Sequence, residues 1–164
     1  MKLFTIGYEG AVIDDFVATL LEAGVQVVLD VREVPISRKK GFSKTALKNA
    51  LFEAGIDYHH FKQLGDPKPG RLAARAGNYD EFRKIYNEHI ASDQSQNALT
   101  EAIDIAKAQR ACLLCFERDP CTCHRSIVLK EMQKAASFTQ QHLGVKEGMA
   151  NSRNDSYATH ASAI

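Results

Sequence analysis

Residues 3–33 read LFTIGYEGAVIDDFVATLLEAGVQVVLDVRE, and the alternation within this stretch decides the fold. The apolar run LFTIGY predicts a strand. The segment DDFVATLLEAG predicts a helix, with Asp14 available to cap its start and Gly24 its end. Its apolar residues recur at helical spacing: Phe16, Val17, Leu20 and Leu21. The run QVVLDVRE predicts a second strand that is buried on both faces, so the stretch forms a βαβ unit, which is typical of a parallel sheet.

The rest of the chain continues this alternation. The run ACLLCFE, at 111–117, is the most apolar short segment and is the best candidate for a central strand. The other expected elements, in chain order, are a helix at 44–54, a strand at 57–65, a surface loop at 66–78, two helices between 79 and 106, a helix at 126–136 and a strand at 138–145. We therefore expect a three-layer α/β fold with a mostly parallel sheet of about five strands flanked by helices.

Composition sets the scale of the molecule. The chain has 164 residues, 45% of them hydrophobic and 25% charged, which suits one packed domain. We place that domain at 1–145 and expect residues 146–164 to be a flexible polar tail.

The formal net charge of +1 gives no global attraction to nucleic acid or membranes. Neither a signal peptide nor an apolar stretch of about 18 residues is evident, so we expect a soluble cytoplasmic protein without membrane contact. The pattern defines no oligomeric state and no cofactor.

Polar residues follow the predicted strands. Tyr8 and Glu9 come after the first strand, Asp30 and Arg32 lie near the end of the second, and Glu117 ends the fourth. Ligands of open parallel sheets bind outside the carboxyl ends of the strands, so these residues are site candidates. Asp30 and Arg32 are two apart and face the same side of a strand. The alternative is that they form a buried structural ion pair.

The segment CFERDPCTCHR places Cys123, His124 and Arg125 at the start of a predicted helix. Free backbone N–H groups and the helix dipole favour an anion there, and an arginine fork binds phosphate or carboxylate through two hydrogen bonds. A phosphate-bearing ligand fits this pattern. The alternative is a helix start with solvated charges.

The four cysteines lie close together in the sequence: Cys112, Cys115, Cys121 and Cys123. Without an export signal we expect free thiols rather than disulfides. The first two residues are three apart in a predicted strand and point to opposite faces, which excludes a zinc knuckle.

Two further chemistries use the same segment. Cys121 or Cys123 is a candidate nucleophile whose proton passes to His124 or Glu117. Cys123 and His124 with a carboxylate form a candidate metal site, although our leading interpretation places no metal here.

A basic loop follows the second strand. Ser37 and Arg38 can contact phosphates there, and Phe42 can stack on a base, as on nucleic-acid surfaces. The lysines of the loop are Lys39, Lys40 and Lys44. The alternative is a solvated loop without a ligand. His59 and His60 are adjacent in a strand and face opposite ways, so they do not form a metal site as a pair.

Four blocks of the sequence resemble the domain-of-unknown-function family DUF488. They are TIGYEG, VVLDVREVPISRKKGFSK, YHHFKQLG and LLCFERDPCTCHR, and together they span roughly residues 3 to 130. The resemblance implies no activity, because the family is named for the lack of one. Cys121 and the polar tail depart from the family's pattern. By the resemblance, the motif positions are Gly7, Tyr8, Asp30, Arg32, Pro35, Ser37, Arg38, Gly41, Phe42, Leu64, Gly65, Glu117, Cys123, His124 and Arg125.

These observations lead to one functional hypothesis and two alternatives. The hypothesis is an enzyme that hydrolyses a nucleotide or nucleic acid, or transfers a group on it. The anion would be held by Arg32, Arg38 and Arg125, with Tyr8 donating a hydrogen bond. The proton would be moved by Asp30, Glu117 or His124. The alternatives are a non-catalytic nucleotide or nucleic-acid binding module and a metal-binding protein.

Overall fold

A five-stranded parallel sheet forms the centre of the molecule. The structure, a computed structural model, describes residues 1–152, and the strand order there is β3-β2-β4-β1-β5 with every neighbouring pair parallel. The strands are β1 (Lys2–Gly7), β2 (Val27–Asp30), β3 (Asp57–His60), β4 (Ala111–Cys115) and β5 (Thr139–Leu143). The predicted fold class is confirmed, and ACLLCFE does supply the central strand.

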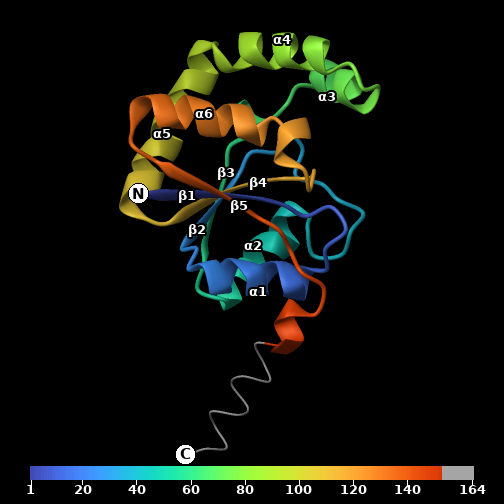
Figure 1. The fold of residues 1–164 in the computed structure, drawn as a ribbon, viewed down its shortest axis with the longest axis vertical. Coiled ribbons are helices and arrows are strands. Elements are labelled where there is room, and N and C mark those ends of the chain that lie inside the picture. The colour runs from blue at the N-terminus through green and yellow to red at the C-terminus, as the bar shows by residue number, and fades with distance from the viewer. Residues whose placement is uncertain (153–164) are drawn as a thin grey trace, which may run out of the picture.

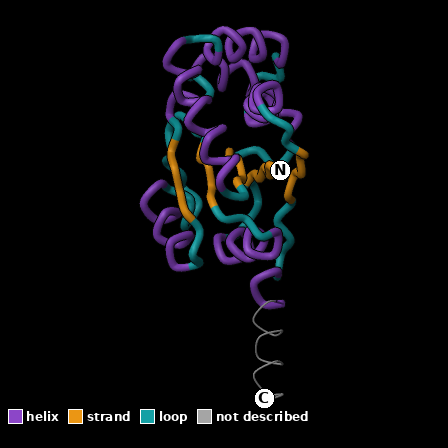
Figure 2. Tube along the Cα trace, turned by 90° about the vertical axis from the view of Figure 1, so that its left-hand side faces the viewer, coloured by secondary structure: helices purple, strands orange, loops and turns teal. Residues whose placement is uncertain are grey.

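Helices cover both faces of the sheet, as Figure 1 shows. One layer holds α1 (Ile13–Ala23) and α2 (Lys44–Glu53). The other holds α3 (Lys68–Arg75), α4 (Tyr79–Ile90), α5 (Asp93–Ala108) and α6 (Arg125–Ala135). Figure 2, turned by 90°, shows the strands between these two sets of helices. Within residues 1–152 no helix is long and apolar enough to cross a membrane.

The chain leaves two neighbouring strands, β1 and β4, toward opposite faces of the sheet. The chain passes from β1 to α1 on one face and from β4 to α6 on the other, while β1 and β4 are hydrogen-bonded to each other. Such a topological switch point opens a crevice at the carboxyl ends of the two strands, where α/β proteins bind ligands. The topology therefore predicts a site after Gly7 and Cys115.

The core lies on both sides of the sheet, which explains the continuous apolar run of β4. Leu113 and Cys115 pack in the cluster under α4, α5 and α6, whereas Cys112 and Leu114 pack in the cluster over α1 and α2. All four side chains are at most 1% exposed. The prediction that Cys112 and Cys115 point to opposite faces is confirmed.

Three boundaries differ from the sequence-based expectation. The second strand ends at Asp30, and the third ends at His60 before a short 3-10 turn, Lys62–Leu64. The predicted surface loop at 66–78 is wrong over most of its length, because Lys68–Arg75 forms α3. Its prolines precede or occupy the first turn, where backbone N–H groups have no intrahelical acceptor, so proline is tolerated.

The start of the predicted tail contacts α1. The backbone N–H groups of Gly148 and Ala150 both donate to the carboxylate of Asp15, each at 3.0 Å. Asp14 does not cap α1 as expected, since Val12 occupies the N-cap without a side-chain hydrogen bond, whereas Gly24 ends the helix as predicted with a φ of 76°. The rest of the predicted tail, 153–164, lies outside the described residues.

The two strands of the switch point approach closely because residue 7 is glycine. A Cβ atom on Gly7 would lie 1.8 Å from the backbone oxygen of Glu117, closer than any real contact. The segment after β4 can therefore pass directly over the end of β1. This close approach sets the position of Glu117 at the carboxyl edge of the sheet.

Replacing Gly7 by alanine should force the 116–118 segment off the end of β1. We expect Gly7→Ala to lower the free energy of unfolding by about 3 kcal/mol, as for an overpacked core site, measured by urea denaturation. Gly144→Ala is the matched control, because its nearest neighbour would be an arginine nitrogen 3.9 Å away. Equal stability of the two variants would contradict the close approach.

Candidate functional site

A cavity of about 710 Å³ opens at the switch point. Four segments surround it: the residue after β1, the segment after β2, the helix α3 with its flanks, and the segment from the end of β4 to α6. Its lining residues are Tyr8, Arg32, Glu33, Val34, Ile36, Ser37, Arg38, Asp66, Arg71, Ala74, Arg75, Tyr79, Cys115, Phe116, Glu117, Thr122 and His124. A cavity of ligand size therefore lies at the carboxyl edge of the sheet, where the sequence predicted a site.

Asp30 and Arg32 form a buried ion pair behind the cavity wall. The Arg32 guanidinium donates to both Asp30 carboxylate oxygens, from Nε at 2.9 Å and from Nη2 at 2.7 Å. Tyr58 Oη donates to the same carboxylate at 2.5 Å. Burial alone would lower the pKa of Arg32, but the hydrogen bonds and charge of Asp30 outweigh it and raise that pKa. Asp30 is fully buried and does not line the cavity. This agrees with the alternative interpretation, in which Asp30 and Arg32 form a buried structural ion pair.

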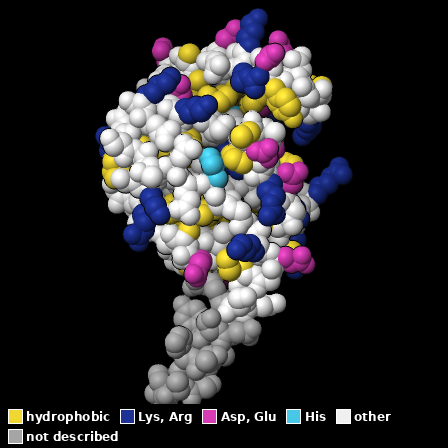
Figure 3. Space-filling model, viewed as in Figure 1, with side chains coloured by type: hydrophobic (Ala, Val, Ile, Leu, Met, Phe, Trp, Pro, Cys, Tyr) yellow, Lys and Arg dark blue, Asp and Glu magenta, His cyan; other side chains and the backbone are white. Residues whose placement is uncertain are grey.

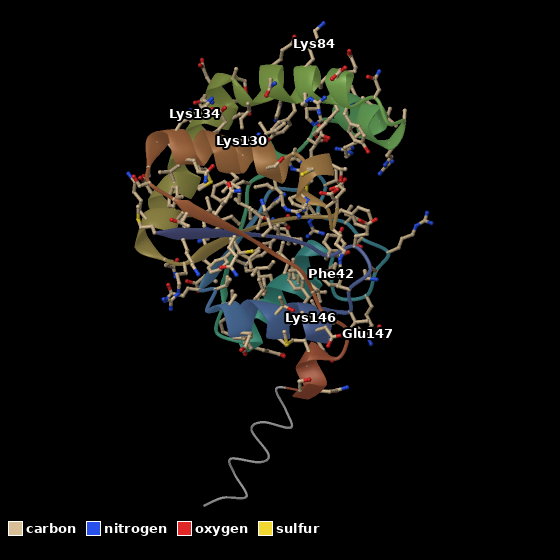
Figure 4. All side chains as sticks on the ribbon, in the orientation of Figure 1. Phe42, Lys84, Lys130, Lys134, Lys146 and Glu147 are labelled. Atoms are coloured by element: carbon tan, nitrogen blue, oxygen red, sulfur yellow. A yellow bond between two sulfur atoms is a disulfide. The ribbon has the colours of Figure 1, made fainter. Side chains whose placement is uncertain are left out.

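Phe42 packs beneath the site rather than facing a ligand. Its ring is fully buried and stacks on Tyr8 with 4.6 Å between centroids. Figure 4 shows Phe42 in the layer between the sheet and α1. The expectation that Phe42 stacks on a base is wrong, because no face of the ring reaches the cavity. Its carbonyl instead accepts a hydrogen bond from Arg32 Nη1 at 2.6 Å.

Tyr8 is part of the cavity wall. Its hydroxyl accepts a hydrogen bond from Arg32 Nη1 at 3.4 Å, so its own proton is left to donate toward a ligand. The ring meets Phe116 edge to face at 5.3 Å, and the Arg32 guanidinium lies 5.3 Å from the ring centroid. Tyr8 is therefore held by aromatic and cation–π contacts in the position that the sequence predicted.

Three further arginines line the cavity. Arg71 Nη1 lies 3.3 Å from Glu33 Oε1 and donates to the carbonyl of Asp66 at 2.7 Å. Arg38 and Arg75 are exposed and form no salt bridge or side-chain hydrogen bond within the described part of the chain. Their guanidinium groups are available to an anion. On the face seen in Figure 3, basic and acidic side chains are interspersed.

Two carboxyl groups in the cavity have raised pKa values. Burial, followed by the charges of Glu117 and Glu33, raises the pKa of Asp66 to about 7, although the charge of Arg71 opposes this. Burial also raises the pKa of Glu117, and the charge of Glu9 adds to the effect. Asp66 is 6% exposed, and its Oδ1 atom has no hydrogen-bond partner among the described residues. Asp66 can therefore hold or release a proton near neutral pH.

The start of α6 is occupied by internal contacts. The guanidinium of Arg125 is fully buried, and it donates to the carbonyls of Glu117 and Arg118 and, at 3.0 Å, to Cys115 Sγ. It does not line the cavity, so its predicted role as an anion ligand is wrong. His124 lines the cavity, but its Nε2 is 2.5 Å from the carbonyl of Val31. Burial lowers the pKa of His124 to about 4, so it is neutral at physiological pH.

The cysteines do not all remain free thiols. Cys115 and Cys123 form a disulfide, which corrects the expectation of four thiols. Cys112 is buried and Cys121 is exposed, both free, and neither they nor Cys123 line the cavity. Cys123 therefore does not face a substrate as a nucleophile. Within residues 1–152 the one candidate metal cluster is Cys115, Cys123 and His124, whose ligand atoms lie within 4.8 Å of one another.

The structure brings together about half of the predicted site. The predicted residues that line the cavity are Tyr8, Arg32, Ser37, Arg38, Glu117 and His124. Those that do not are Glu9, Asp30, Phe42, Cys123 and Arg125. Glu9 is exposed, and its carboxylate accepts a hydrogen bond from the backbone N–H of Arg118 at 3.0 Å, which supports the segment after β4.

Sequence reasoning missed the contribution of α3. Asp66, Arg71 and Arg75 line the cavity from the predicted loop at 66–78, and Tyr79 lines it from the start of α4. A signal was present, because Arg71 and Arg75 are four residues apart and share one face of a helix. The prolines and glycines of DPKPGRLAARAGN concealed that helical spacing.

The fold and the cavity define a class of protein: a doubly wound α/β domain with a cavity at its switch point that several charged side chains line. The chain belongs to the family described as domain of unknown function DUF488, which matches residues 12–132. This match confirms the resemblance carried by the sequence blocks, of which TIGYEG lies ahead of the matched residues. Comparison with curated proteins and with solved structures gave no match.

The raised pKa of Asp66 should make stability depend on pH. The pKa rises from 3.8 to about 7 on folding, so between these values the unfolded chain loses a proton that the folded protein keeps. Stability therefore falls as pH rises from about 4 to 7. Asp66→Asn stays neutral, so its melting temperature should match the native protein's at pH 4 and exceed it at pH 8. The gain at pH 8 should be at most about 4 kcal/mol, at 1.36 kcal/mol per pKa unit.

The control is Asp80→Asn, because Asp80 is 97% exposed. Its difference from the native protein should not change over the same pH range. A gain for Asp66→Asn that is equally large at pH 4 and pH 8 would show that Asp66 does not hold a proton in the folded state.

Proposed function

We propose that this protein is an enzyme that binds a small phosphate-bearing substrate of nucleotide size in the switch-point cavity and catalyses its hydrolysis or a group transfer. Arg38 and Arg75 would contact the phosphate, and Tyr8 would donate a hydrogen bond to it. Asp66 and Glu117 would move the proton. The proposal needs no particular cofactor.

One observation carries this proposal: Asp66, whose buried Oδ1 has no partner within residues 1–152, lines a cavity that also presents free guanidinium groups. Buried polar atoms in folded proteins almost always have a hydrogen-bond partner, in the protein, in water or in a ligand. A substrate hydroxyl or an attacking water supplies that partner here. The same cavity supplies positive charge for the phosphate beside it.

The two carboxyl groups suit general acid and base roles. With a pKa of about 7, Asp66 is close to half protonated at neutral pH, which is the optimum for proton transfer there. Because the charge of Glu117 raises the pKa of Asp66, the two groups favour sharing one proton. One carboxylate would take a proton from the attacking hydroxyl or water, and the protonated partner would return one to the leaving oxygen.

Aromatic side chains at the cavity favour a nucleotide over a simple phosphate ester. Phe116 is 46% exposed and Tyr79 is 38% exposed, and both line the cavity. Exposed aromatic rings stack on bases whatever the base sequence. A mononucleotide would place its base against one of these rings and its phosphate near Arg38 and Arg75.

An extended nucleic-acid surface is a weaker alternative. The aromatic residue expected to stack in the basic loop, Phe42, is fully buried. The net charge is only +1, and basic and acidic groups alternate on the face shown in Figure 3. Arg38 and Arg75 offer their guanidinium groups at a cavity, which suits a small anion better than a long backbone.

Removal of the free arginines should abolish ligand binding without unfolding the protein. We expect a nucleoside mono- or diphosphate from a panel to raise the melting temperature of the native protein by several degrees, as ligand at 100 times Kd stabilises by about 2.7 kcal/mol. Arg38→Ala and Arg75→Ala should each weaken Kd ten-fold or more, because hydrogen bonds to charged groups contribute about 1.5–3 kcal/mol. Arg83→Ala, whose arginine pairs with Asp80 on the surface, is the matched control.

Turnover separates an enzyme from a binding module. With the nucleotide found in that panel, Asp66→Asn should keep binding and lower kcat by about 100-fold or more, the usual contribution of a general acid or base. Native binding without product under any metal or pH condition would contradict the enzymatic proposal. Full binding by Arg38→Ala and Arg75→Ala would contradict the assignment of the cavity.

A further inference from the structure

The disulfide joins two elements at the floor of the cavity. Cys115 is the last residue of β4, and Cys123 lies eight residues later, just before α6. Both sulfur atoms are buried, but only Cys115 is part of the cavity lining. A small thiol or disulfide that enters the cavity therefore meets Cys115 and not Cys123.

Arg125 carries a buried positive charge that forms no close ion pair within the described residues. Its side chain is fully buried and forms no salt bridge within the described residues, and its Nε has no hydrogen-bond partner there. Its Nη1 donates to Cys115 Sγ at 3.0 Å. A buried charge is costly unless it is paired, so a thiolate at Cys115 would supply the missing counter-charge. The reduced protein gains an ion pair that the disulfide form lacks.

The surroundings of both sulfur atoms favour their reduced forms. The backbone N–H of Arg125, at the start of α6, donates to Cys123 Sγ at 3.5 Å, and helix N-termini stabilise thiolates. His124 Nδ1 lies 3.8 Å from the same sulfur, and because Nε2 of this neutral ring donates to the carbonyl of Val31, Nδ1 can accept a hydrogen bond from the Cys123 thiol. Glu117 Oε2 lies 3.5 Å from Cys115 Sγ, and burial favours its protonated form, which can donate to a thiolate. The groups that face Cys115 and Cys123 therefore stabilise the reduced form of the couple.

We propose that Cys115 and Cys123 are a redox-active couple that exchanges with low-molecular-weight thiols and their disulfides through the cavity. Arg125 acts as the positioning residue that holds the Cys115 thiolate. This inference does not depend on the phosphate-bearing substrate. It distinguishes the couple from a structural disulfide, which stays oxidised in the presence of small thiols.

The exchange balances in two steps. An external thiolate attacks Cys115 Sγ, the bond between Cys115 and Cys123 breaks, and its electron pair leaves on Cys123 Sγ. A second external thiolate attacks the external sulfur of the mixed disulfide, which releases Cys115 as a thiolate and forms an external disulfide. Two external thiolates are oxidised, and the protein disulfide is reduced by two electrons. The reverse sequence oxidises the protein.

The test is a redox titration of the full chain in buffers of varied reduced to oxidised glutathione ratio, followed by acid quenching, unfolding, alkylation with iodoacetamide and mass spectrometry of peptides. Cys115 and Cys123 should change from unlabelled to labelled together, at one ratio. The free thiols Cys112 and Cys121 lie outside the couple, so their labelling should not change at that ratio. A pair that stays unlabelled at every ratio, or labelled at every ratio, overturns the proposal. One tightly bound metal ion per chain that blocks alkylation until it is chelated also overturns it.

Two variants test the order of attack. Cys123→Ser should trap glutathione as a mixed disulfide on Cys115, whereas Cys115→Ser should trap little on Cys123 because that sulfur does not line the cavity. Cys121→Ser is the matched control and should leave the redox titration unchanged. Equal trapping at both positions overturns the assignment of Cys115 as the attacked sulfur.

The role of Arg125 is tested by the pH dependence of Cys115 alkylation. In the reduced native protein, the alkylation rate of Cys115 should reach half its maximum below the pH of about 8.5 that is typical of a free thiol. Arg125→Met should slow this alkylation at pH 7 by about ten-fold for each unit that the thiol pKa rises. If the variant does not fold, the native pH profile still decides. A half-maximum at pH 8.5 or above overturns the role of Arg125.

Discussion

The buried guanidinium of Arg125 is the interaction on which the cavity floor depends. It begins α6 and reaches back to the end of β4, where it donates to the carbonyls of Glu117 and Arg118 and to Cys115 Sγ. Gly7 allows the same segment to pass directly over the end of β1. The position of Glu117, and with it the charge inside the cavity, follows from these two constraints. The segment after β4 is thus a surface segment whose backbone is held in place by the buried Arg125.

The arginines around the switch point divide into two groups. Arg32 and Arg125 are buried, and their N–H groups donate to oxygen and sulfur atoms of the protein. These two arginines therefore hold the segments around the cavity in place. Arg38 and Arg75 are exposed and remain available. This division explains how a chain with a net charge of +1 can still offer two guanidinium groups without a salt bridge at the cavity. It also places the two carboxyl groups with raised pKa values beside the positive charge that a phosphate would seek.

Much of the fold could be predicted from the sequence because its signals are local. The βαβ periodicity of residues 3–33 and the apolar run of β4 predicted a parallel sheet, and the strand-end rule then predicted the correct edge. The helix α3 was missed because Pro67, Pro69 and Gly70 resemble a loop. Pairing of Asp30 with Arg32 and burial of Phe42 depend on contacts between distant segments. The residue types predicted which segments carry charged side chains. Only the tertiary packing decides which of these side chains line the cavity.

The central claim is that the free arginines of the cavity, and not the buried ones, bind a phosphate-bearing anion. The most direct measurement is a titration of ¹⁵N-labelled protein with a nucleoside monophosphate, followed through the arginine Nε–Hε resonances by NMR. The account predicts that the signals of Arg38 and Arg75 shift and saturate together, while that of Arg125 moves little because its guanidinium is engaged within the fold. Shifts confined to surface arginines such as Arg83, or no saturable shift at all, would contradict it.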